Sequence, residues 1–96
     1  MPSNRGEVTY RWISVGSTFV PSYKLQRMVN SIASSNVVAG WSGDVVVIQD
    51  INRERWLWGF NLRKVGNHRR RSSASGHATE LKDAQEAAEL AAGKIG

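Results

Sequence analysis

Two neighbouring segments near the middle of the chain constrain the fold most strongly, because each has the pattern of a β-strand. The first, residues 44–50, contains four consecutive β-branched side chains, which resist helix and suit a pleated surface. The second, residues 55–63, alternates so that its bulky apolar side chains share one face: Trp56, Trp58, Phe60 and Leu62. Between them, Asp50 and Asn52 favour a turn. The two segments therefore predict an antiparallel hairpin.

The aromatic face of this hairpin has two interpretations. It is either a core face covered by helices or an exposed platform on which nucleic-acid bases stack. We favour the core, because burying each Trp or Phe contributes about 2–3 kcal/mol, which a small domain needs. The segment Glu80–Ala92 supplies a cover, since it has helical periodicity, an alanine-lined apolar face and Thr79 as its N-cap.

Three further segments complete the expected set of elements. Residues 7–15 alternate as a strand, and residues 69–74 fit a short strand at the sheet edge, where charge discourages aggregation. Residues 22–33 predict a first helix, because a single helical stripe gathers their apolar side chains, Leu25, Met28, Val29, Ile32 and Ala33.

Together these elements predict an α+β fold of order β-α-β-β-(β)-α. We expect a small antiparallel sheet of three to four strands with two helices packed on one face. Ninety-six residues suit one domain, which we place at residues 7–96, with residues 1–6 as a flexible tail.

The positive charge of the chain is concentrated in one segment. The whole chain carries a net charge of +5, whereas residues 53–71 contain seven basic residues and one acidic residue, a net +6. Such a local field favours nucleic acid or an acidic protein surface as partner. We predict a small, basic, non-enzymatic module that contacts nucleic acid, DNA or RNA, through Arg53, Arg55, Arg63, Lys64, Arg69, Arg70 and Arg71.

Two alternatives stay open. The basic segment could be a solvated charge run that protects a sheet edge. The protein could instead be an interaction module, such as a bacterial or phage accessory protein or inhibitor, that acts through the sheet edge and forms a homodimer in one version. Trp41 is then a candidate partner contact, because it either caps the edge of the core or stands exposed.

The sequence does not indicate catalysis, a metal site or a cofactor. His68 and His77 lie among polar, flexible residues, and the chain contains no cysteine, so a zinc-type ligand set is not evident. No apolar run approaches the roughly 20 residues of a membrane helix, and the first residues lack the apolar segment of a secretory signal. We therefore expect a cytoplasmic protein that is not an enzyme and does not enter the membrane.

Overall fold

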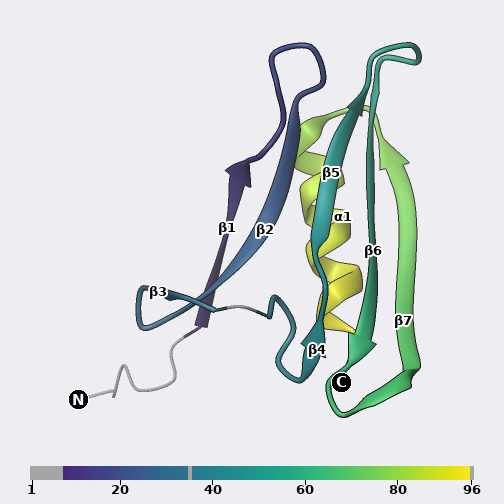
Figure 1. Cartoon of the computed structure of the whole chain (residues 1–96). Coiled ribbons are helices and arrows are strands. Elements are labelled where there is room, and N and C mark those ends of the chain that lie inside the picture. Colours follow the sequence, from purple (N-terminus) through teal and green to yellow (C-terminus); the bar gives the residue numbers. More distant parts are fainter. Residues whose placement is uncertain (1–7, 35, 96) are drawn as a thin grey trace.

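The protein is mostly sheet, with strand making up 55% of the structure and helix 15%. The computed structural model describes residues 8–34 and 36–95, so the expected tail at residues 1–6 lies outside the described residues. The described chain forms one antiparallel sheet of seven strands and a helix that lies against one face of it (Figure 1). The elements are β1 Val8–Ser14, β2 Ser22–Val29, β3 Ile32–Ala33, β4 Trp41–Ser42, β5 Val45–Asp50, β6 Arg55–Lys64, β7 Asn67–Ala78 and α1 Leu81–Gly93.

The predicted fold class is wrong in the size of the sheet and in the number of helices. The sheet has seven strands instead of three to four, and the described residues form one helix instead of two. The main path of the sheet runs β1-β2-β5-β6-β4, while β3 adds to β2 and β7 adds to β6.

The missing helix is the segment from residue 22 to residue 33, which forms β2, a tight turn and β3. Asn30 and Ser31 have φ angles of 52° and 68°, the left-handed values that a two-residue hairpin turn of type I′ requires. Strand β2 pairs along its length with β1 and at its start with β5. Leu25 and Val29 are four residues apart, a spacing that fits a strand face as well as a helix face. This segment therefore forms a strand and not a helix because it pairs with a strand on each side.

The predicted central hairpin is confirmed. Strands β5 and β6 pair in antiparallel register, with Val47 opposite Trp58 and Asp50 opposite Arg55. The third strand of this ribbon is also confirmed as β7, and it is longer than predicted. The closing helix begins one residue later than predicted, at Leu81. Its N-cap is Glu80, which makes no side-chain capping bond, so the assignment of Thr79 as the N-cap is wrong.

The aromatic row of β6 belongs to the core, as predicted. Phe60 is 8% exposed and Leu62 is fully buried, while the two Trp side chains of the row are half-buried. Helix α1 covers them with Ala84 and Ala88, both fully buried, and it packs on β5, β6 and β7. The small side chains allow the helix axis to approach the sheet closely.

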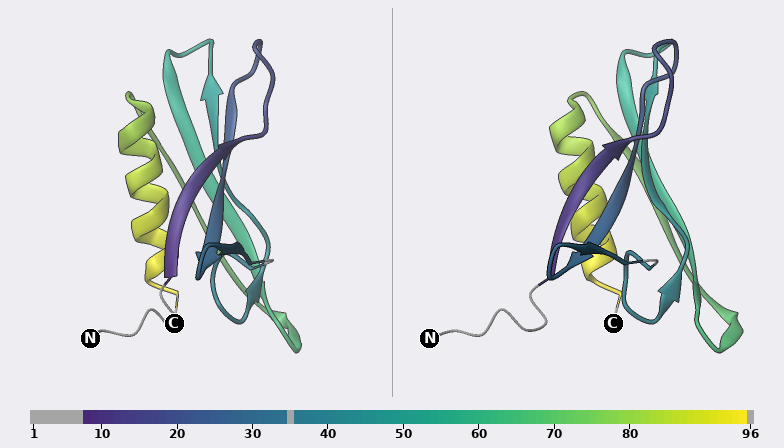
Figure 2. Two further views of the ribbon diagram at one scale, coloured as in Figure 1. Left: turned by 90° about the vertical axis from the view of Figure 1, so that its left-hand side faces the viewer. Right: turned by 60° about the vertical axis from the view of Figure 1, so that its left-hand side comes forward.

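The helix leaves two regions of the sheet uncovered. Figure 2 shows α1 on one side only, so the opposite face of the sheet carries no described element. On the helix side, α1 does not pack along β1 and β2, and it reaches β1 through one hydrogen bond from Trp12 Nε1 to Glu89 Oε1, 3.2 Å long. In the described part of the chain, no helix has the length and apolar character needed to cross a membrane.

Candidate nucleic-acid interface

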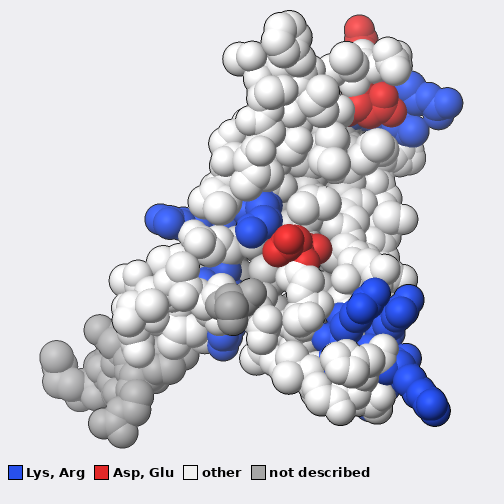
Figure 3. Space-filling view, viewed as in Figure 1, with Lys and Arg blue, Asp and Glu red and all other residues white. Residues whose placement is uncertain are grey.

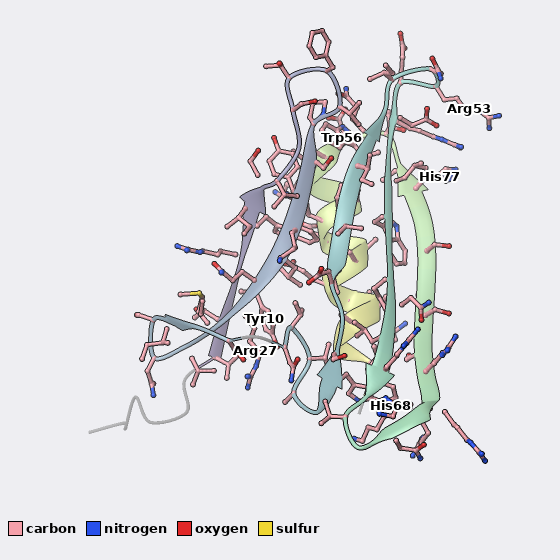
Figure 4. All side chains as sticks on the ribbon, viewed as in Figure 1. Tyr10, Arg27, Arg53, Trp56, His68 and His77 are labelled. Atoms are coloured by element: carbon pink, nitrogen blue, oxygen red, sulfur yellow. The ribbon has the colours of Figure 1, made fainter. Side chains whose placement is uncertain are left out.

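The predicted basic residues fall into two groups at opposite ends of the β5–β6–β7 ribbon. Arg53 and Arg55 lie at the turn between β5 and β6, whereas the other five lie where β6 meets β7. Strand β6 has ten residues, which at about 3.3 Å per residue separates the two ends by about 30 Å. Figure 4 shows this separation through Arg53 at one end and His68 at the other.

The group at the β5–β6 turn is partly neutralised within the protein. Arg55 Nε lies 3.3 Å from Asp50 Oδ2, and the two residues are cross-strand partners that close the hairpin. Arg53 is exposed in the four-residue loop, beside Glu54 in sequence. This end of the ribbon therefore carries little net positive charge, and the structure does not bring it together with the other predicted site residues.

The other group lies on both faces of the β6–β7 hairpin near its turn; we call it the basic tip, and it consists of Arg63, Lys64, Arg69, Arg70 and Arg71. A break in the strand register creates it. Lys64 pairs with Asn67, but the next pair is Arg63 with Arg71, so residues 68–70 bulge from the ladder. Residues 67–71 are all exposed. Figure 3 shows the corresponding gathering of Lys and Arg side chains at this end of the ribbon.

Two arginines of the basic tip face each other directly. Arg63 and Arg71 are partners across the antiparallel ladder, so their Cα atoms are about 4.5–5.5 Å apart and their side chains leave the sheet on the same face. Like charges in directly opposite positions destabilise a sheet. An anion placed between the two guanidinium groups would remove this repulsion.

The described residues provide no such anion. Within residues 8–34 and 36–95, the ion pairs are Lys24 with Asp44 and Arg55 with Asp50, and neither includes a residue of the basic tip. Asp44, which precedes β5, lies 3.6 Å from Lys24 Nζ through its Oδ1. The positive charge of the basic tip is therefore not neutralised by an ion pair with any described carboxylate.

Trp41 lies beneath the basic tip and not on its surface. The indole is 6% exposed, and its strand, β4, pairs with the end of β6 so that Trp41 is opposite Lys64. Lys64 Nζ lies 5.3 Å from the ring centroid, within the range of a cation–π contact. Of the two predicted placements, the structure has the one in which Trp41 caps the core, and its small exposed area offers a partner little to contact.

Three polar residues beside the arginine pair were not identified from the sequence. Ser42 pairs with Arg63 on the side of the row away from Arg71, and Asn61 pairs with Ser73 in the next row on the same face. The sequence feature that could have revealed them is the alternation of side chains along a strand, which places every second residue on the same face as Arg63 or Arg71. Together they give the open face near the basic tip hydrogen-bonding groups as well as charge.

No protein-family model matches this chain, and no curated protein or solved structure matches it significantly.

Proposed function

We propose that the protein binds the phosphate backbone of nucleic acid through the basic tip. The observation that carries the proposal is the directly opposed pair Arg63–Arg71, which has no carboxylate within ion-pair distance among the described residues. Arginine presents donors in a planar fork that suits phosphate oxygens, so one phosphate between the two guanidinium groups converts a repulsion into two favourable contacts.

The shape of the basic tip supports contact with a phosphate backbone. Strand β4 pairs with β6 at Arg63 and Lys64, so only the turn and the bulge of the β6–β7 hairpin, residues 65–70, extend beyond the rest of the sheet (Figure 2). The exposed bulge at residues 68–70 adds Arg69 and Arg70 at the end of the ribbon. This placement supports backbone contact without base-specific recognition.

The proposal predicts a steep dependence of affinity on salt. If all five cations of the basic tip neutralise phosphates, the slope of log K against log salt on duplex DNA approaches about −4.5. Replacing Arg69, Arg70 and Arg71 with alanine should weaken binding and reduce the magnitude of that slope by up to about 2.7. Fluorescence anisotropy with labelled duplex DNA, duplex RNA and single strands, at several salt concentrations, measures both quantities.

A matched control variant distinguishes the effect of the basic tip on affinity from the effect of the protein's net charge. The triple variant Arg11→Ala, Arg53→Ala and Lys82→Ala removes the same charge from exposed positions outside the basic tip. It should bind nearly as the unchanged protein does. Equal effects of the two triple variants, or no binding at low salt, would reject the proposal. Light scattering on the same samples tests the separate proposal of a homodimer formed through the sheet edge.

A further inference from the structure

A cavity on the helix side of the sheet is separate from the basic tip and shares no residue with it. It has a volume of about 580 Å³, within the roughly 300–1,000 Å³ of small-molecule sites. It lies where α1 does not pack along β1 and β2, and its wall combines those strands, the segment before β4 and the last turn of the helix. Its apolar lining comes mainly from Leu25, Val37, Val38, Ala92 and Ile95.

One charged side chain, Glu89, lines this cavity. Its Oε1 accepts the hydrogen bond from Trp12 Nε1 at 3.2 Å, which orients the carboxylate. No ion pair of the described residues includes Glu89. A protein with a net charge of +5 thus presents a carboxylate to the cavity.

The end of the helix also lies at the cavity. Ala92 and Gly93, in the last turn of α1, line the cavity. The carbonyl groups of Ala91 and Ala92 already accept hydrogen bonds from the backbone N–H groups of Lys94 and Ile95. The carboxylate of Glu89 is therefore the group of the wall that favours a cation.

The nearby arginine is engaged elsewhere. Tyr10, 49% exposed, lines the cavity, and Arg27 is its partner on β2, as Figure 4 shows. The Arg27 guanidinium donates to Ser34 Oγ at 3.3 Å, and Arg27 is not part of the cavity wall. Tyr10 also adds an aromatic side chain to the wall.

We propose that this cavity binds a small organic cation with an apolar body, such as an aliphatic or aromatic amine. The apolar wall receives the body of the ligand, and the carboxylate of Glu89 receives its ammonium group. This site would work independently of nucleic-acid binding, because it uses none of the residues of the basic tip.

Three probes of equal chain length test the charge preference: n-octylamine, octanol and octanoate. Titration of each into the full chain, followed through backbone amide NMR shifts, should perturb Leu25, Val37 and Ala92 with octylamine. Octylamine should bind about fivefold more tightly than octanol, the size expected of a partly exposed ion pair, and octanoate should bind more weakly still.

The variant Glu89→Gln tests the carboxylate without removing the acceptor for Trp12, because the amide oxygen of glutamine can accept the same hydrogen bond. It should reduce octylamine affinity to that of octanol. Glu86→Gln, on the same helix but outside the cavity wall, is the matched control and should leave the affinity unchanged. Octanoate binding as tightly as octylamine, an unchanged affinity in Glu89→Gln, or shifts confined to residues away from the cavity would each overturn the proposal.

Discussion

Trp58 lies against the backbone of Gly76, its partner on the neighbouring strand. A Cβ atom at position 76 would lie 2.8 Å from three atoms of the indole, closer than real Cβ contacts. The absence of a side chain at Gly76 therefore leaves the space that the Trp58 indole occupies. Gly43 has a similar role between β4 and β5, where φ is 132° and a Cβ would meet Leu62 at 2.8 Å.

Replacing Gly76 with alanine should lower the free energy of unfolding by about 1–3 kcal/mol, because the added methyl group overpacks the site and displaces the Trp58 ring. Urea denaturation followed by tryptophan fluorescence measures the change. Gly93→Ala is the control, since a Cβ there meets nothing within 4 Å and its stability should stay equal or rise slightly. A Gly76→Ala protein as stable as the unchanged chain would contradict the close approach.

Among the elements, β2 shows most clearly where sequence patterns fail. Its apolar side chains fit a helical stripe, yet its position between β1 and β5 gives it strand partners on both sides. The hairpin β5–β6 was predictable because bulky residues alternate over the whole of its second strand, and α1 was predictable because its alanines repeat at helical spacing. For β2 the local pattern allowed both structures, so long-range pairing determined which one formed.

A substitution at the β2–β3 turn distinguishes the two structures directly. Ser31 has a φ angle of 68°, which glycine adopts without the steric cost that serine bears, so Ser31→Gly should raise the free energy of unfolding by about 0.5–1 kcal/mol. In a helix interior the same change would lower it by about as much. Chemical denaturation of the variant and the unchanged protein shows whether the free energy of unfolding rises or falls. Gln26→Gly, in the middle of β2, should be destabilising and serves as the control.

The candidate site illustrates the same limit of sequence analysis. Arg55 and Arg63 belong to one short stretch of sequence, but an extended strand carries them to opposite ends of the ribbon. The charge count of residues 53–71 treated all seven cations as one group, and only the register of β6 and β7 showed which five of them lie together. The bulge at residues 68–70 could not be inferred from the sequence, because a run of arginines does not specify where the pairing register of two strands changes.

The whole molecule divides into a well-packed part and a thinly covered part. Helix α1 packs on β5, β6 and β7, and the fully buried side chains there include Val45, Val47, Leu62, Ala84 and Ala88. Strand β1 has no buried residue, and beside the cavity it is joined to the helix by the hydrogen bond from Trp12 to Glu89. The sheet is continuous, but its stabilising contacts are concentrated on one side.

Hydrogen exchange should reveal this division. Backbone amides of β5, β6 and α1 should exchange only through opening of the whole domain, whereas those of β1 should exchange faster through local opening. Exchange of the full chain, measured by NMR at neutral pH, ranks the amides. Equal protection of β1 and β6 would show that the two parts unfold as one unit. An amine that fills the cavity should slow exchange in β1, which links this measurement to the proposed ligand.

Through its contact with Trp41, Lys64 belongs both to the basic tip and to the packing around a buried side chain. The same ammonium group that belongs to the proposed phosphate-binding surface also lies over an indole that is almost fully buried. Truncating this lysine would thus alter surface potential and hydration of the interior together, and a lost affinity could not be assigned to either cause. Exchange for arginine, which keeps both the charge and the ring contact, is the cleaner way to examine how this position works.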